Sequence, residues 1–331
     1  MKTRRDALRI LAVGGAAAVA WKLGLRGSPR RLVERSRVLM GTEVHLQVLG
    51  DDPEAAAAAA DATLATMARL EGLLSRHDPN SELSRLNARG RLEGASDALI
   101  EVLRLADRIS HLGDGAFDVT VQPVLDLHRR GPGAQRSWPA AETIEAALSR
   151  VDHRSIRIEG SVVSLARPEM SITLDGIGKG YVVDGGVAEL ERRGYGNVFV
   201  EAGGDLVAGG GRGGGEPWRI GIRSPRADLT IQARFNARNR AVATSGDYMQ
   251  PFTDDYAQHH IVDPRTGYSS PELASATVVA PDAATADALA TLVMVLGAHR
   301  GRELLEALPA CEGYLVSKTL EVTRTSNFIL A

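Results

Sequence analysis

The residues best suited to chemistry in this chain lie in a glycine-rich turn over residues 175–180, which reads DGIGKG. Its three glycines let the backbone approach a ligand closely and adopt positive φ without a Cβ clash. We expect a strand-like lead-in over residues 170–174 and a helix after the turn that ends at Gly194. The free N–H groups at the start of this helix, with the amine of Lys179, suit an anion such as a phosphate. Most such turns are only tight turns, so the motif needs support from elsewhere.

A carboxylate and a hydroxyl stand four residues apart near the C-terminus, at Asp287 and Thr291. In a helix this spacing places both side chains on one face. Two oxygen ligands, completed by backbone carbonyls, waters and substrate phosphates, are a usual environment for Mg²⁺. A hydrogen-bonded pair without a metal is the alternative, and on the residues alone it is the more common one.

Three further motifs place polar residues beside apolar segments. Residues 244–248, TSGDY, resemble a ligand-gripping turn, although ordinary Asx and ST turns have the same composition. His259 and His260 begin another segment, where a histidine is either a general base or simply hydrogen-bonded. Residues 202–205, AGGD, allow close approach to a flat ligand or form a bulge.

Helices and short strands must position these motifs. Apolar residues at helical spacing predict helices over residues 52–74, 96–113 and 140–148, and a last helix capped by Asp282. Residues 115–120 suggest a turn into an extended segment. The other segments that predict strands or hairpins are residues 38–49, 155–165, 197–201, 206–208, 218–223, 229–236, 241–246, 259–263, 274–280, 314–316 and 320–323. Because no regular β-α-β rhythm is present, the pattern favours an α+β fold.

The composition of the 331-residue chain excludes several classes of protein. Hydrophobic residues make up 44% and charged residues 24%, as in ordinary globular proteins. A net charge of -2 and an aromatic content of 4% give no electrostatic or stacking basis for binding nucleic acid. Cys311 is the only cysteine, which excludes an intrachain disulfide and a cysteine-based metal cluster.

The N-terminal residues have the pattern of an export signal. Paired arginines, Arg4 and Arg5, precede a short apolar run over residues 10–20. This is typical of a twin-arginine signal peptide over residues 1–20, followed by a linker over residues 21–37 and one domain over residues 38–331. We expect export to the periplasm with cleavage, and an uncleaved anchor in the inner membrane is the alternative. Twin-arginine export suits a protein that folds around a cofactor first.

Eight motifs spread along the chain are more specific together than any one of them alone. They are Met40-Gly41-Thr42, Asn80-Ser81-Glu82 with Asn87, Gly115-Ala116-Phe117-Asp118, the segment from Gly176 to Asp184, Gly203-Gly204-Asp205, the segment from Thr244 to Tyr248, the segment from His260 to Gly267, and the segment from Ala286 to Thr291. They occur in the order seen in the ApbE family of FAD:protein FMN transferases. The sequence resembles that family over about residues 38–327.

The resemblance implies a T-fold-like α+β domain, with antiparallel sheets flanked by helices, that uses FAD as substrate and Mg²⁺ as metal. Such enzymes transfer FMN to a Ser or Thr hydroxyl of a target flavoprotein and release AMP. The residues that would contact FAD are Met40, His77, Ala116, Phe117, Asp118, Thr173, Lys179 and Ile261. The residues that would hold Mg²⁺ are Asp287, Thr291 and, through its carbonyl, Gly176, and His260 would be the base.

Two positions depart from the pattern of the family. His77 stands where an aromatic residue is usual, and imidazole stacks on a flavin less strongly. Thr173 stands where an acidic residue is common, and Asp175 would be an imperfect substitute. The implied partner is an acceptor flavoprotein of a membrane or periplasmic redox complex, as in the NosX-like branch linked to nitrous oxide reduction. Two other readings stay open, namely an FAD-binding store and an FAD pyrophosphatase that yields FMN and AMP.

Overall fold

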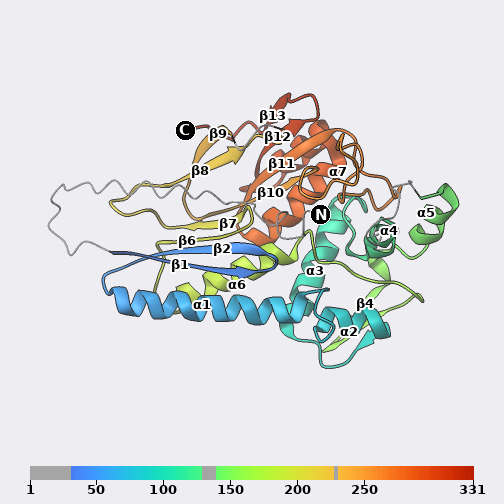
Figure 1. Cartoon of the computed structure of the whole chain (residues 1–331), viewed down its shortest axis with the longest axis horizontal. Coiled ribbons are helices and arrows are strands. Elements are labelled where there is room, and N and C mark those ends of the chain that lie inside the picture. Colours follow the sequence, from blue (N-terminus) through green and yellow to red (C-terminus); the bar gives the residue numbers. More distant parts are fainter. Residues whose placement is uncertain (1–30, 129–138, 227–229) are drawn as a thin grey trace, which may run out of the picture.

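An antiparallel sheet of eight strands forms the centre of the computed structural model, which describes residues 31–128, 139–226 and 230–331 (Figure 1). Its strand order is β1-β2-β6-β7-β10-β11-β12-β13. The bounds are β1 Arg31–Leu39, β2 Thr42–Gly50, β6 Val198–Ala202, β7 Asp205–Gly209, β10 Arg240–Gly246, β11 Leu273–Ala280, β12 Glu312–Ser317 and β13 Val322–Arg324. Every residue of β11 is buried, because this strand is covered on both faces of the sheet.

Three long helices, α1 (Pro53–Leu74), α6 (Gly178–Arg192) and α7 (Ala283–Ala307), cover one face of this sheet (Figure 1). The side chain of Asp52 caps α1 by accepting from two backbone N–H groups of its first turn. The side chain of Asp282 caps α7 by accepting from the N–H of Thr285 at 2.8 Å, as the sequence predicts. Capping side chains of this kind satisfy N–H groups that have no partner within the helix.

Helix α7 is interrupted at Gly297, where the backbone has φ 81° and leaves the helical region. A Cβ at this position would overlap the carboxylate of Glu272. The same carboxylate accepts from the N–H of Ala298 at 3.0 Å and so caps the second part of the helix. Asp287 and Thr291 both belong to the first part.

The opposite face of the sheet is covered by a hairpin of β8 (Trp218–Arg223) and β9 (Ile231–Ala237). Its apolar side chains join those of the large sheet and Phe328 in a second hydrophobic cluster. The rings of Phe235 and Phe328 lie 5.0 Å apart within it. The sheet is therefore the middle layer between helices and a hairpin.

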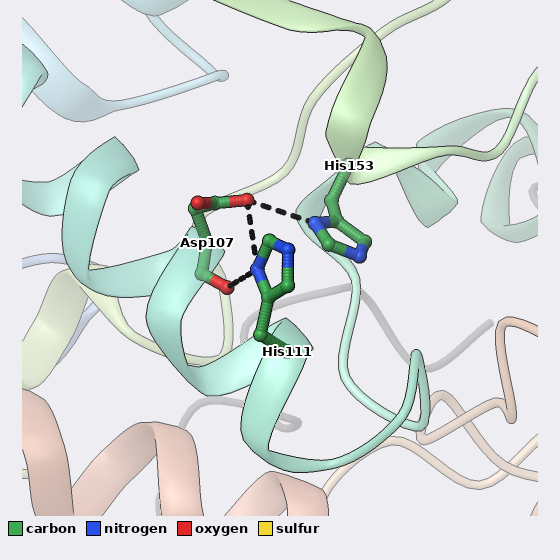
Figure 2. Close-up of side chains that lie close together, drawn as sticks. All are labelled: Asp107, His111 and His153. Atoms are coloured by element: carbon green, nitrogen blue, oxygen red, sulfur yellow. Dashed lines mark hydrogen bonds and ion pairs between the residues drawn. The ribbon is translucent and has the colours of Figure 1, made fainter.

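A smaller unit of short helices and strands lies beside the helical layer (Figure 1). Its elements are α2 Glu82–Arg89, β3 Arg91–Leu92, α3 Asp97–Leu112, η1 Val119–Val121, α4 Gln122–Leu127, α5 Ala141–Leu148, η2 His153–Ser155, β4 Ile156–Glu159 and β5 Val162–Leu165. Turn η2 contacts α3 through His153, whose Nδ1 lies 2.9 Å from Asp107 Oδ1 (Figure 2). Together these elements confirm the α+β prediction.

The N-terminal part of the domain differs from the prediction. The linker predicted over residues 21–37 is wrong from Arg31 onward, because residues 31–39 form β1 and pair along their whole length with β2. The single strand predicted over residues 38–49 is in fact the end of one strand, a tight turn and the next strand. Met40 and Gly41 form that turn with φ of 52° and 71°. Residues 1–30, including the predicted signal peptide, lie outside the described residues.

Three local predictions of strand are also wrong. Residues 170–174 are extended but pair with no strand, because the side-chain amide of Asn87 bonds both the N–H and the C=O of Ile172, at 2.7 and 2.8 Å. After residue 118 the chain forms the helical turn η1 in place of an extended segment. Residues 259–263 form only two isolated bridges, at His259 and Val262. Within the described residues, no helix is both long and apolar enough to cross a membrane.

Candidate active site

Helices α6 and α7 cap each other at the point where the glycine-rich turn ends. The N–H of Gly180, in the first turn of α6, donates to Asp287 Oδ2 of α7 at 3.1 Å. In return Asp184 of α6 accepts from the N–H groups of Ala283 and Ala284, both at 2.8 Å. A Cβ at Gly180 would overlap the carbonyl of Ala283, so only glycine permits this close approach. The reciprocal caps fix the turn against the first part of α7.

Burial in this helix junction changes the acidity of its carboxyl groups. Desolvation raises the pKa of Asp184 to about 7, although its two backbone hydrogen bonds lower it. Desolvation also raises the pKa of Asp287 well above its ordinary value, and the nearby charge of Asp205 adds to this effect. Perturbed carboxyl groups of this kind are frequent at functional sites.

Lys179, Asp205 and Asp287 form a buried charged cluster. Lys179 Nζ pairs with Asp205 Oδ2, and both carboxylates are almost fully buried. Burial alone would lower the pKa of Lys179, but the charges of Asp205 and Asp287 raise it overall. Desolvation likewise raises the pKa of Asp205, against the opposing charge of Lys179. One ammonium thus faces two acidic groups, so the cluster carries an excess of negative charge that could attract a further cation.

Thr291 lies one turn after Asp287 on the same face of α7, as its spacing predicts. Its Oγ1 is 3.1 Å from the hydroxyl of Ser245, which stands near the end of β10. A Cβ built on Gly176 would lie 3.0 Å from the same Oγ1, so the glycine-rich turn passes directly over Thr291. The structure therefore brings Gly176, Lys179, Asp287 and Thr291 together.

Phe117 closes one side of this group. A Cβ built on Gly176 would lie 3.4 Å from its ring, and both Phe117 and Ala116 are buried. Met40 stands in the β1–β2 turn, where its N–H donates to Glu71 Oε1 at 2.7 Å. No measured contact tests whether Met40, Ala116 and Phe117 touch FAD, so these assignments stay predictions.

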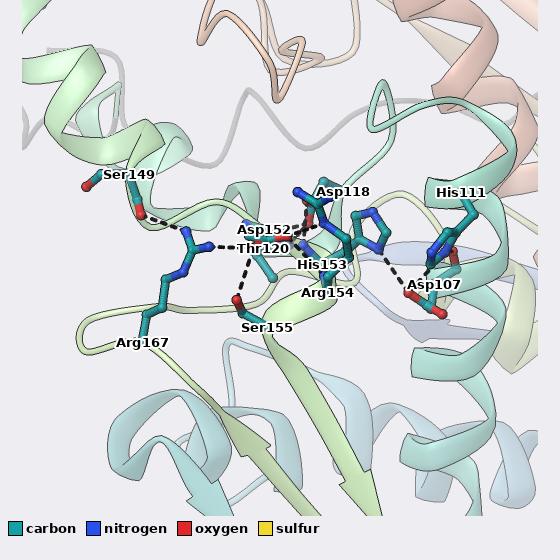
Figure 3. A network of polar contacts seen from close by, with 10 residues as sticks. All are labelled: Asp107, His111, Asp118, Thr120, Ser149, Asp152, His153, Arg154, Ser155 and Arg167. Atoms are coloured by element: carbon teal, nitrogen blue, oxygen red, sulfur yellow. Dashed lines mark hydrogen bonds and ion pairs between the residues drawn. The ribbon is translucent and has the colours of Figure 1, made fainter.

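Asp118 anchors the loop that carries Phe117 (Figure 3). Its Oδ1 accepts from the N–H and the hydroxyl of Thr120 at 2.8 and 2.6 Å, and its Oδ2 accepts from the N–H of His153 at 2.8 Å. Desolvation raises the pKa of Asp118, and these hydrogen bonds oppose the rise. Both carboxylate oxygens of Asp118 thus have protein partners. A contact between Asp118 and FAD, as predicted, would have to use an oxygen that already accepts a hydrogen bond.

His259 and His260 are neighbours with different environments. His259 is fully buried, where its Nε2 lies 2.9 Å from the carbonyl of Ser270 and its Nδ1 accepts from Ile261 N at 3.3 Å. His260 is half-buried, and its buried Nδ1 has no hydrogen-bond partner within the described residues. Burial, with the charge of His259, lowers the pKa of His260 to about 4, although Asp175 opposes the shift. At neutral pH His260 is therefore unprotonated, as a general base requires.

The loop that contains His77 is tied to the glycine-rich turn through its neighbour. His77 itself is exposed, whereas Arg76 pairs with both oxygens of Asp175, Nε lying 2.7 Å from Oδ2. Thr173 is buried, and its hydroxyl accepts from the N–H of Asp175 at 3.2 Å. Asp175 is the expected substitute for the acidic residue that Thr173 replaces, and its carboxylate is paired with Arg76.

Sequence reasoning missed several residues that shape the site. Asp205 and Asp184 both lie in recognised motifs, yet only the structure shows that one pairs with Lys179 and the other caps α7. Ser245 belongs to the TSGDY motif, whose Asp247 instead forms a bidentate pair with Arg226 at 2.7 and 2.8 Å. The available signal was that Asp184 and Asp205 each stand next to a glycine. Their partners lie too far away in the sequence for this signal to identify them.

The family model and the curated relatives that match this chain point to the same family. The model of the ApbE family matches residues 40–315. The FAD:protein FMN transferase of Vibrio cholerae is 37% identical over 242 residues, covering 71% of this chain and 72% of that protein. The FAD:protein FMN transferase of Haemophilus influenzae is 32% identical, covering 89% and 90%.

Solved structures agree with this result. The ApbE protein of Thermotoga maritima superposes with a TM-score of 0.81 at 30% identity, covering 90% of this chain and 98% of that one. The flavin transferase ApbE of Vibrio cholerae superposes with a TM-score of 0.77 at 32% identity, covering 91% and 99%. With its fold, its motifs and these relatives in agreement, the chain belongs to the ApbE family.

Proposed function

We propose that this chain is an FAD:protein FMN transferase that moves FMN from FAD to a Ser or Thr hydroxyl of an acceptor flavoprotein and releases AMP. The observation that carries the proposal is the convergence of Lys179, Asp287 and Thr291 at Gly176 in a chain of this family. In the reaction, the acceptor hydroxyl loses its proton and its oxygen bonds to the FMN phosphorus. The bond from that phosphorus to the AMP oxygen breaks.

The residues around Asp287 fit Mg²⁺. Carboxylate, hydroxyl and carbonyl oxygens are the ligands this ion prefers, and the buried cluster holds two carboxylates against one ammonium. We assign Asp287, Thr291 and the carbonyl of Gly176 to hold it. When bound, the ion would neutralise charge on the diphosphate oxygens.

The residues of the chain itself would bind and orient the substrate. Lys179 has three N–H donors, of which Asp205 takes one, and its side chain is 27% exposed. It therefore retains donors for a phosphate oxygen of FAD. The adjacent N-terminus of α6 adds the positive end of a helix dipole. His260, unprotonated at neutral pH, would accept the proton of the acceptor hydroxyl at its ring nitrogen.

Export is part of the same proposal and rests on the sequence of residues 1–20. A twin-arginine signal would deliver the folded protein to the periplasm, where the acceptor flavoprotein of a redox complex would be modified. Fractionation of cells that produce the full chain tests this directly. Protein found only in the cytoplasm, with its N-terminus intact, would contradict export without affecting the transferase assignment.

The decisive experiment combines the full-length protein, FAD, Mg²⁺ and a candidate acceptor domain. We expect a fluorescent acceptor band on a denaturing gel and a mass gain of one FMN unit on a Ser or Thr residue. Asp287→Ala should abolish both signals. Asp61→Ala is the matched control, because Asp61 of α1 is an exposed carboxylate that pairs with Arg35 and belongs to none of the site motifs. Equal labelling by both variants would exclude the assigned site.

The same assay separates transfer from hydrolysis and storage. With the acceptor omitted, a transferase should release AMP only slowly, because no hydroxyl of comparable position replaces the acceptor. Steady AMP release without acceptor would identify a pyrophosphatase. Tight binding of FAD with no turnover under either condition would identify a flavin store.

A further inference from the structure

Asp107, His111 and His153 form a second polar cluster, and none of them belongs to the glycine-rich turn (Figure 2). Asp107 and His111 stand four residues apart near the end of α3, and His153 begins turn η2. One ligand atom from each residue, a ring nitrogen or a carboxylate oxygen, lies within 4.8 Å of the other two. Among the described residues this is the one group of three histidine, cysteine or acidic side chains with that property.

The distances within the cluster suit a tetrahedral metal ion. Asp107 Oδ1 is 2.9 Å from His153 Nδ1 and 3.3 Å from His111 Nδ1, and His111 Nδ1 also lies 2.8 Å from the backbone carbonyl of Asp107. A metal ion would replace these hydrogen bonds. Around a tetrahedral zinc ion with bonds of about 2.0–2.1 Å, neighbouring ligand atoms lie about 3.3 Å apart. The two imidazole rings are 4.7 Å apart and nearly perpendicular, at 84°, so they converge without stacking.

The surrounding structure holds the three side chains in place before any ion arrives (Figure 3). Helix α3 fixes the spacing of Asp107 and His111. The N–H of His153 donates to Asp118 Oδ2 at 2.8 Å, and Asp152 caps turn η2 through the N–H of Arg154 at 3.2 Å. Preorganisation of ligands by such outer hydrogen bonds raises metal affinity.

Exposure of the cluster gives an ion a route of entry. The side chain of His153 is only 10% exposed, whereas Asp107 is 49% and His111 is 62% exposed. One ligand is therefore anchored in the protein while the other two face solvent, where water can complete the coordination. Imidazole ligands favour zinc, copper and nickel over magnesium.

We propose that Asp107, His111 and His153 form a binding site for a divalent transition-metal ion of the zinc type, separate from the site of flavin chemistry. An ion there would lock turn η2 onto α3. Through the bond from His153 N to Asp118 it would also stiffen the loop that carries Phe117.

The test uses the full-length protein without a histidine tag, stripped with a chelator. Zn²⁺ is added by titration calorimetry in buffer with excess Mg²⁺, which occupies sites built from oxygen ligands. We expect one Zn²⁺ per chain. His111→Ala and His153→Ala should each weaken the binding at least tenfold, on the scale of effects of changed metal ligands. Co²⁺ should give the visible absorption of a tetrahedral site with the wild-type protein and lose it with His111→Ala.

The control variant is His299→Ala, because His299 is an exposed histidine 3.3 Å from Glu303 at the same helical spacing. It should retain full Zn²⁺ affinity. His111 is exposed at the end of α3, so its variant should melt at the same temperature as wild type without metal. No Zn²⁺ bound by the wild type, or equal binding by wild type and His111→Ala, would overturn the proposal. Loss of Zn²⁺ in Asp287→Ala alone would also overturn it.

Discussion

Two clusters of ionisable side chains differ chiefly in their burial. Lys179, Asp205 and Asp287 are enclosed between α6, α7 and the sheet, where desolvation raises the pKa of both carboxyl groups and their charges raise the pKa of Lys179 overall. The cluster of Asp107, His111 and His153 lies at the surface, with two of its three side chains about half exposed or more. Buried charge in low dielectric interacts strongly with an incoming cation or phosphate, whereas exposed groups are screened by water. Because of this difference in burial, the enclosed cluster is suited to catalysis and the open one to simple ion binding.

The adjacent residues His259 and His260 also differ in their surroundings, here in whether their ring nitrogens have hydrogen-bond partners. Both ring nitrogens of His259 contact backbone groups, so its ring is committed to structure. The next residue, His260, keeps a buried nitrogen without a partner in the described part of the chain. A free nitrogen beside the glycine-rich turn is available for chemistry, and a satisfied one is not.

The largest effect that tests the comparison is expected from Asp287→Asn. This change keeps the size of the side chain but removes the charge that would attract Mg²⁺. Metal contributions of several kcal/mol correspond to a loss of at least about 100-fold in kcat/KM. The measurement is the initial rate of AMP release with saturating acceptor. His299→Asn, far from the enclosed cluster, should leave the rate unchanged.

Gly180→Ala should have the next largest effect, which is a loss in the free energy of unfolding. The new Cβ would overlap the carbonyl of Ala283 and force α6 and α7 apart. Overpacking of this kind costs about 1–3 kcal/mol in the free energy of unfolding, which urea denaturation measures. Gly72→Ala in α1 is the matched control, because nothing lies within 4 Å of its Cβ position. That variant should gain up to about 1 kcal/mol through helix propensity.

The pH dependence should separate Asp287 from His260. The pKa of the Asp287 carboxyl is raised, so protons compete with Mg²⁺ there as the pH falls, and the apparent Mg²⁺ affinity should drop. Excess Mg²⁺ should restore the rate. The remaining acid limb of kcat/KM should then lie near pH 4, where His260 gains its proton and stops acting as a base. A limb near pH 6.5 that is insensitive to Mg²⁺ would show that burial does not control His260.

The smallest effect is expected from Arg76→Ala, which removes a partly exposed ion pair with Asp175. Such pairs contribute about 0–1 kcal/mol, so the free energy of unfolding should change by less than about 1 kcal/mol. The charge of Asp175, no longer balanced, would favour the protonated form of His260. The acid limb of kcat/KM should therefore move to higher pH by less than about one unit. Arg91→Ala is the control. It removes an ion pair with Glu93, two residues along the chain, and should leave the acid limb of kcat/KM where it is.

Much of the fold follows from local patterns in the sequence. Helices α1, α3, α5 and α7 begin within one residue of their predicted starts, because caps such as Asp52 and Asp282 and apolar spacing are local signals. The lead-in before the glycine-rich turn could not be predicted correctly. Its backbone is satisfied by the amide of Asn87, a residue 85 positions earlier, instead of by a strand.

The candidate site shows the same limit. The shared face of Asp287 and Thr291 follows from helical spacing alone. The pairing of Lys179 with Asp205, and the reciprocal caps that Asp184 and Asp287 form between α6 and α7, depend on tertiary approach at Gly180. Local sequence indicates which residues can do chemistry, but burial and distant partners decide which of them have perturbed acidity.

The interruption of α7 at Gly297 divides one helical sequence into two parts. The first part sets the rotation of Asp287 and Thr291 about the helix axis, and the second part begins at the carboxylate of Glu272. A Cβ built on Gly301 would lie 2.7 Å from the side chain of Val293, so the two parts pack closely against each other. A larger residue at position 301 would therefore press on the part that carries Asp287 and Thr291.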